Sequence, residues 1–226
     1  MLAGYAAKRY EIREAYTKIR LTAKDAKVKI APSEDGVTAL AISEKKRRPY
    51  RCVVTDGTLT VEPLKKKWYH ALRIGRDRSE ISLYLSAAVP EALEVSANVG
   101  CVEISSIACC GEIDIVVNTG RLSVVDVSCQ SFESRGNTGA LSATGLIAEK
   151  SISVKRNTGK VLLTDCVSPE ILVKTNTGSV GGRLPSGTSF SVRTNTGSVE
   201  LPKAPIGEAV GGRCEIKTNT GHIRFE

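Results

Sequence analysis

The sequence predicts an all-β fold, a single-chain parallel β-helix (β-solenoid), on three observations. A twelve-position phrase returns along the chain, most clearly from Phe190 to Leu201. In each copy apolar residues alternate with polar ones on both sides of a turn, which most often reads Asn-Thr-Gly. The copies follow one another at a nearly fixed spacing. Such a period is typical of stacked supersecondary units and not of a globule built around one pocket.

The turn glycines define the period. Their successive spacings are 20, 19, 20, 19, 19 and 24 residues. These glycines are Gly100, Gly120, Gly139, Gly159, Gly178, Gly197 and Gly221. The Asn-Thr-Gly turns begin at Asn118, Asn137, Asn157, Asn176, Asn195 and Asn219, and the first turn is the variant Asn98-Val99-Gly100. Glycine supplies the positive φ that a tight turn needs, and asparagine tolerates unusual backbone conformations. We therefore expect a structural ladder of turns along the molecule.

The alternation on each side of the turn indicates β-strands with one side buried. A two-residue Asn-Gly turn would close an antiparallel hairpin, but here Thr separates Asn from Gly. One unit cannot bury its apolar side alone, so we expect successive units to stack in parallel. Each Asn would then lie over the previous one, and the amides would hydrogen-bond along the stack. The prediction is coils of 19–20 residues with Asn-Thr-Gly turns and a narrow apolar interior.

The N-terminal section follows the same pattern less regularly. Two degenerate copies of the phrase fall in register with the regular ones. They are carried by Ile19, Leu21, Ala26, Val28 and Ile30, and by Tyr50, Cys52, Gly57, Leu59 and Val61. We expect residues 1–86 to form an irregular, basic, β-rich section continuous with the solenoid. Residues 87–226 would form the regular repeats, and a single domain overall is the alternative.

The net charge of +8 comes from the N-terminal section. Residues 1–86 hold 19 Lys and Arg against 10 Asp and Glu, a balance of +9, whereas residues 87–226 hold 13 against 14, a balance of −1. Two runs dominate: Lys45, Lys46, Arg47 and Arg48, and then Lys65, Lys66, Lys67, Trp68 and Tyr69. Most charge runs are solvated loops. These two are nevertheless the candidate contact for an anionic polymer or a lipid surface, with the aromatic rings at the interface.

No catalytic, cofactor-binding or metal-binding residue is predicted. The seven cysteines show no CxxC or Cys/His ligand spacing, so zinc is not expected. Their number is odd, and the pattern favours a reducing compartment or an anaerobe in which surface thiols survive. The two histidines, His70 and His222, lie in separate sections. Some β-helices cleave polysaccharides with converging carboxylates, but the acidic residues here occupy differing coil positions. No nucleic-acid motif accompanies the basic runs, so nucleic acid is not an expected partner.

The repeat resembles the putative-adhesin family of bacterial β-helical domains of unknown function, found in Firmicutes and Bacteroidetes. Asp56-Gly57-Thr58-Leu59-Thr60-Val61 and Gly211-Gly212-Arg213-Cys214-Glu215-Ile216 contribute to the likeness, which extends from about Tyr10 to Phe225. The resemblance implies a β-helix without catalytic residues. Many members display the β-helix beyond an N-terminal membrane helix, which this sequence does not contain. We therefore expect a position at the cell envelope if an anchor is missing, and in the cytoplasm otherwise.

Two functions remain as expectations. The first is a non-catalytic structural or interaction module, an adhesin-like β-helix that binds an acidic envelope polymer, a membrane surface or a protein. The alternative is a cytosolic self-assembling scaffold. The sequence ends at Phe225-Glu226, directly on the last expected strand. An open solenoid end presents unpaired N–H and C=O groups to a second copy, so end-to-end self-association is expected in that case. A carbohydrate-active enzyme is a third and weaker hypothesis.

Overall fold

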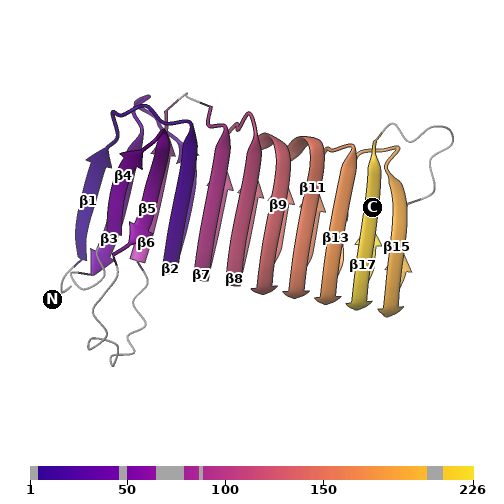
Figure 1. The fold of residues 1–226 in the computed structure, drawn as a ribbon. Helices are drawn as coiled ribbons and strands as arrows, with labels where there is room; N and C mark the ends of the chain where they lie inside the picture. Colours follow the sequence, from indigo (N-terminus) through magenta and orange to yellow (C-terminus); the bar gives the residue numbers. More distant parts are fainter. Residues whose placement is uncertain (1–4, 46–49, 65–78, 87–88, 203–210) are drawn as a thin grey trace.

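The structure is a computed structural model that describes residues 5–45, 50–64, 79–86, 89–202 and 211–226. All regular elements of this part are strands, and they join in one sheet that winds into a rod (Figure 1). The prediction of an all-β, solenoid-like fold is confirmed. Among the described residues no helix is long and apolar enough to cross a membrane.

A single coil has two main sides that meet at the turn. In β8 (Glu112–Val125) the residues before the turn alternate so that Ile113, Ile115 and Val117 are buried, and after it Leu122 and Val124 are buried. We call the side before the turn face A and the side after it face B. Three strands cover both faces: β8, β2 (Lys18–Pro32) and β7 (Ala92–Ser105).

In the other coils the turn separates two strands. Face A continues through β9 (Ser128–Thr138), β11 (Ile147–Thr158), β13 (Glu170–Thr177), β17 (Arg213–Thr220) and β15 (Ser189–Thr196). Face B continues through β10 (Leu141–Thr144), β12 (Val161–Thr164), β14 (Val180–Arg183), β18 (Ile223–Phe225) and β16 (Val199–Glu200). Figure 1 shows the strands of face A side by side along the rod.

Parallel pairing places equivalent residues of neighbouring coils on one another. Phe132 pairs with Ile113 on one side and Ile152 on the other, and Gly120 pairs with Gly100. Equivalent side chains therefore form columns along the rod. Buried residues of a third, short side complete the interior, namely Ile107, Val127, Leu146 and Cys166. The interior columns are mostly aliphatic, so burial of apolar surface stabilises the stack.

The N-terminal end departs from the regular stack. β2 forms a complete coil and pairs in parallel with β7 on one side, and with β5 (Thr58–Pro63) and β6 (Ser79–Leu85) on the other. Three further strands pair antiparallel: β4 (Tyr50–Thr55) with β5, β3 (Ala39–Lys45) with β6, and β1 (Tyr5–Glu11) with β3. This end of the rod is therefore closed by antiparallel strands.

One of the two degenerate copies is not a coil, and its prediction is wrong. Tyr50 to Val61 form an antiparallel hairpin in which Cys52 pairs with Val61. The turn residues Asp56 and Gly57 have φ values of 49° and 68°, and two consecutive positive φ values suit a two-residue hairpin turn. The alternation of apolar residues is the same in a hairpin and in a coil, so it did not separate the two.

The C-terminal coils do not follow the order of the sequence. β17 lies between β13 and β15, because Cys214 pairs with Ile171 on one side and with Phe190 on the other. β18 lies between β14 and β16 in the same way. The outermost layer is therefore β15 with β16, and the C-terminal strand is internal (Figure 1). The expectation that the last strand of the chain forms the open end is wrong, and so is the stacking of every Asn on the previous one.

Candidate interaction surface

The described part of the chain contains no group of three or more His, Cys, Asp or Glu side chains that could hold a metal ion. Two surface depressions of this part lie on face A. They are shallow, because the interior is filled by the side chains of the coils themselves. The surface, and not the interior, is therefore where a partner would bind.

The asparagines of the turns are joined by side-chain hydrogen bonds. At five turns Nδ2 donates to the Oδ1 of the asparagine in an adjacent coil, whereas no such bond joins Asn137 to Asn118 in the described residues. The bonds run from Asn118 to Asn98 at 3.0 Å, Asn157 to Asn137 at 3.0 Å, Asn176 to Asn157 at 3.3 Å, Asn219 to Asn176 at 3.0 Å, and Asn195 to Asn219 at 2.5 Å. Asn219 accepts from Asn195 and donates to Asn176, so the ladder follows the spatial order of the coils. All of these asparagines from Asn118 onward are exposed.

The turn glycines form a column beside the asparagines. At Gly178 φ is 151°, and a Cβ atom added there would overlap the backbone carbonyl of Gly159. The same overlap recurs at the other turn glycines, each against its neighbour in the adjacent coil. The corner therefore needs glycine for close packing of the coils as well as for backbone conformation.

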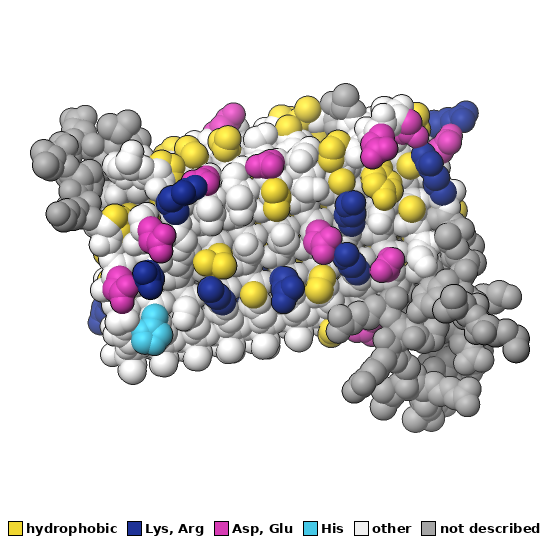
Figure 2. All heavy atoms as spheres, turned by 180° about the vertical axis from the view of Figure 1, so that it is seen from behind, with side chains coloured by type: hydrophobic (Ala, Val, Ile, Leu, Met, Phe, Trp, Pro, Cys, Tyr) yellow, Lys and Arg dark blue, Asp and Glu magenta, His cyan; other side chains and the backbone are white. Residues whose placement is uncertain are grey.

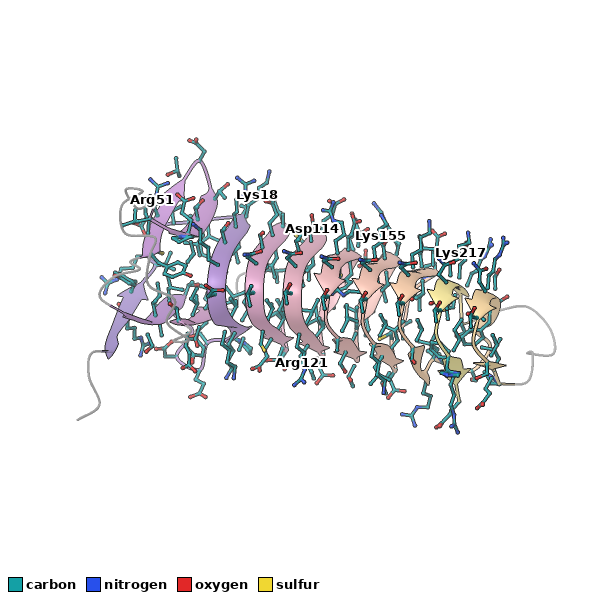
Figure 3. The ribbon with its side chains drawn as sticks, turned by 90° about the horizontal axis from the view of Figure 1, so that it is seen from below. Lys18, Arg51, Asp114, Arg121, Lys155 and Lys217 are labelled. Atoms are coloured by element: carbon teal, nitrogen blue, oxygen red, sulfur yellow. The ribbon has the colours of Figure 1, made fainter. Side chains whose placement is uncertain are left out.

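Basic side chains occupy one outward column of face A, which we call the basic row. In spatial order it contains Arg135, Lys155, Lys174, Lys217 and Arg193. Each residue pairs directly with the next across adjacent strands, so the row runs parallel to the rod axis. Figure 3 shows Lys155 and Lys217 on one side of the rod and Arg121 on the opposite side.

Carboxylates neutralise the basic row only in part. Arg135 contacts Asp114 at 2.5 Å, Lys155 contacts Glu133 at 3.2 Å, and Lys217 contacts Glu215. In the described residues no carboxylate lies within ion-pair distance of Lys174 or Arg193. Exposed pairs of this kind contribute little to stability. The row is therefore an accessible line of positive charge with two members that have no carboxylate contact.

Arg156 is the one arginine among the buried residues of the described chain, with 6% of its surface exposed. It occupies an inward column, between Gly136 and Thr175 of the adjacent coils. Its Nη2 donates to Ser134 Oγ at 2.8 Å, and its Nη1 lies 3.5 Å from the Lys155 carbonyl oxygen. Burial lowers the pKa of its guanidinium to about 10. No described carboxylate is within ion-pair distance of it.

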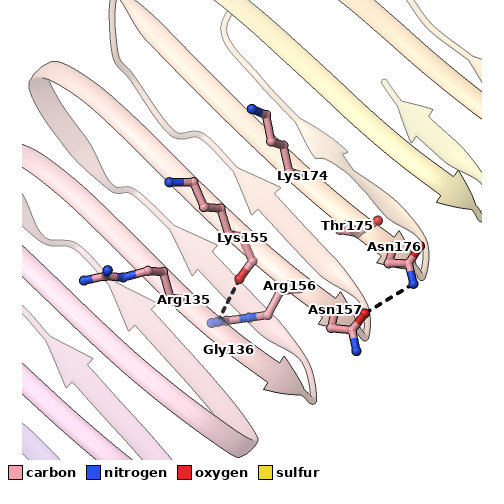
Figure 4. A pocket seen from close by; sticks show the side chains of 8 residues that line it. All are labelled: Arg135, Gly136, Lys155, Arg156, Asn157, Lys174, Thr175 and Asn176. Atoms are coloured by element: carbon pink, nitrogen blue, oxygen red, sulfur yellow. Dashed lines mark hydrogen bonds between the residues drawn. The ribbon is translucent and has the colours of Figure 1, made fainter.

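The first depression lies where the basic row and Arg156 meet. It is lined by Arg135, Gly136, Lys155, Arg156, Asn157, Lys174, Thr175 and Asn176. Figure 4 shows the three row side chains extending in one direction, Arg156 lying against Gly136, and the Asn157–Asn176 hydrogen bond at the corner. Positive groups and neutral amides therefore surround a single site on the exposed face.

Face B has a different character. Figure 2, which views the rod from behind, shows Lys and Arg mixed with Asp and Glu and no continuous region of one sign. Arg183 contacts Asp165 at 2.8 Å on this face, and Arg224 contacts Glu200 at 3.4 Å. Face A therefore differs from face B because it carries the continuous basic row.

The structure tests little of the predicted anionic-partner contact. Lys45 is the last residue of β3. Lys46, Arg47 and Arg48, and Lys65, Lys66, Lys67, Trp68 and Tyr69, lie outside the described residues. Sequence reasoning missed the basic row because the balance of residues 87–226 is near zero. The signal was present: Lys or Arg precedes the turn at the same position in five copies.

All seven cysteines are free thiols. Cys109, Cys129, Cys166 and Cys214 are buried, and Cys110 is exposed. Burial raises the pKa of Cys129 and Cys214 to about 12 and that of Cys166 to about 11. The buried thiols therefore remain protonated at neutral pH, so they act as small apolar side chains.

Comparison with known proteins identifies related folds. The family described as Toastrack DUF4097 matches residues 16–226. A putative adhesin from Bacteroides fragilis is 15% identical, with 98% of this chain and 96% of that chain covered and a TM-score of 0.54. A putative lipid binding protein from Parabacteroides distasonis is 12% identical, with 97% and 96% covered and a TM-score of 0.49. No curated protein matches. The chain belongs to the Toastrack DUF4097 family.

Proposed function

We propose that the protein is a non-catalytic interaction module, an adhesin-like repeat rod at or near the cell envelope that binds a polymer or protein partner. In this proposal coils of 19–20 residues with Asn-Thr-Gly turns form the scaffold, and residues 1–86 and 87–226 form one continuous body. The outward columns of the coils make the contacts.

The observation that carries the proposal is the repetition of outward side chains over a filled interior. Neighbouring coils present equivalent residues in register, as Lys155 and Lys174 do. Extended binding surfaces of this kind are what stacked-repeat proteins use to bind long partners. The similarity in fold to a putative adhesin supports the same function.

The position of the protein in the cell tests the proposal directly. Intact cells that make the protein would be treated with a protease and with a membrane-impermeant thiol reagent before lysis. Cys110 is exposed and gives the reagent a target. Cleavage and labelling from outside are the expected result. Full protection in the soluble fraction would contradict the proposal and favour the self-assembling intracellular scaffold.

A further inference from the structure

We propose that the basic row and Arg156 bind a linear acidic polysaccharide, laid along the rod axis with one acidic group in the depression above Arg156. The inference rests on the proposed function and names the class of partner for it. The acidic group would be a carboxylate or a sulfate. Asn157 and Asn176 would face the sugar hydroxyls.

The geometry of the row fits a linear chain. Arg135, Lys155, Lys174, Lys217 and Arg193 stand in single file, each on the next strand of a parallel sheet. Adjacent strands are about 4.8 Å apart, so four steps give a line of charge of roughly 19 Å. Like charges this close repel one another within the Debye length at physiological salt. A polyanion lying along the row relieves that repulsion at every step.

Arg156 adds an observation that does not depend on the row. A buried guanidinium is costly unless a negative group pairs with it. Asp114 and Glu133, on the two preceding strands of face A, contact Arg135 and Lys155 and are not within ion-pair distance of Arg156. Only Ser134 Oγ, at 2.8 Å, is within good hydrogen-bond distance of the guanidinium. Because Arg156 lines the depression, an anion bound there supplies the missing partner.

The surroundings favour a glycan over other polyanions. The lining of the depression contains no aromatic side chain, whereas proteins that bind single-stranded nucleic acid stack bases on aromatic rings. A membrane surface would need basic groups spread over a plane. Here the basic row is flanked on one side by Glu133 and Glu215 and on the other by the asparagine ladder. The basic row would bind the acidic groups of a polysaccharide, and the neutral amides beside it would hydrogen-bond to its hydroxyls.

The test is a calorimetric titration of the whole chain with polygalacturonate at low and at physiological salt. Dextran serves as the neutral polysaccharide, and phosphatidylglycerol vesicles and oligo-dT serve as the other polyanions. We expect polygalacturonate to bind, with affinity falling as salt rises, and dextran not to bind. Preference for vesicles or for oligo-dT over polygalacturonate would overturn the inference.

Variants locate the site. Lys174→Gln with Lys217→Gln, and separately Arg156→Met, should each weaken polygalacturonate binding about tenfold or more, since a charge-assisted hydrogen bond is worth at least that factor. The matched control is Arg121→Gln with Lys160→Gln, which removes two charges from face B and should change the affinity less than about twofold. Equal losses in the control and the row variants would overturn the inference. Melting temperatures establish that each variant is folded, and Arg156→Lys tests the charge in a variant of similar shape.

The two proposals fail in different ways. If the protein is labelled from outside the cell but polygalacturonate does not bind, the acidic-polysaccharide inference is wrong and the interaction module stands. If the chain is protected inside the cell but binds polygalacturonate through Arg156 and Lys174, the envelope position is wrong and the surface assignment stands.

Discussion

At the scale of single residues, the turn glycines combine two requirements that substitution can separate. Gly178 has positive φ and also lies against the Gly159 carbonyl, whereas Gly36 has a φ of 71° with no atom near an added Cβ. Gly36→Ala should therefore lose about 1 kcal/mol of unfolding free energy through backbone strain. Gly178→Ala should lose several times as much, because the coils must move apart. Urea denaturation of both variants checks this, and equal losses would refute the packing role of the column.

The asparagine ladder should contribute less than a buried network would. Asn176 is exposed although it donates to Asn157 and accepts from Asn219. We expect Asn176→Ala to cost about 1 kcal/mol, in the range of an ordinary hydrogen bond. Asn195 makes a single amide bond, to Asn219, in the outermost layer, and Asn195→Ala is the milder control. An unchanged urea midpoint for Asn176→Ala would show that the ladder has no stabilising role.

The buried thiols make stability fall in alkaline solution. An unfolded thiol has a pKa of about 8.5, whereas the pKa of Cys214 is raised to about 12 by burial. Above pH 8.5 the unfolded chain therefore binds fewer protons than the folded one, and stability decreases as pH rises. Each such thiol contributes at most about 1.4 kcal/mol per pH unit. Urea midpoints from pH 8 to 10 measure the slope. Cys214→Ala should reduce it, and the exposed control Cys110→Ala should not.

At the scale of elements, the inserted coil gives a direct test of topology. Lys174 pairs with Lys217, and Lys217 pairs with Arg193. Position 174 is therefore one strand spacing, about 5 Å, from position 217 and two spacings from position 193. Disulfides need Cα atoms closer than about 7 Å. Mild oxidation of the Lys174→Cys, Lys217→Cys variant should give a cross-link, and the Lys174→Cys, Arg193→Cys variant should give none. Peptide mapping would identify the bond, and the reverse result would mean that the coils stack in chain order.

The order of the coils could not be read from the sequence, although the strands could. The alternation and the turn glycines predict the strands of β11, β13 and β17 well, because burial of one side imposes a period of two. The coils around Asn176, Asn195 and Asn219 share almost the same phrase, however. Their inward columns match in either order, so local pattern gives no preference between stacking in sequence and inserting the last coil. The two stacking orders differ in the loops that connect the coils and in which coil forms the outermost layer.

The candidate surface was hidden for a related reason. The net charge of a section sums all its residues, whereas stacking of the coils places equivalent residues of successive repeats in one column on the surface. Lys155 and Lys174 do not stand out in a section of near-zero net charge. They are 19 residues apart, one repeat, so they pair directly on adjacent strands. The alternation of Ile152 and Val154 does place Arg156 in an inward column, but an arginine there is unexpected and its burial is shown only by the structure. Its pairing with Thr175 agrees with its place one residue before Asn157 in the repeat.

At the scale of the whole molecule, the two ends of the rod are unlike. The N-terminal end finishes in antiparallel strands, whereas β15 of the outermost C-terminal layer pairs with β17 and with no other described strand. This layer also exposes apolar side chains that are buried elsewhere in their columns. Val199 is 44% exposed, and its equivalent in the next coil, Ile223, is fully buried. An edge of this kind is a template for pairing with another chain.

We therefore expect reversible dimers that join through the C-terminal layers, since two identical edges can meet around a two-fold axis. Val199→Lys places a charge in that contact and should raise the dimer dissociation constant about tenfold or more. Val167→Lys is the matched control, because Val167 is 45% exposed on the short third side, away from the ends. Sedimentation velocity over a range of concentrations measures both variants. A parent protein of constant monomeric mass, or equal shifts in the two variants, would contradict self-association through this end.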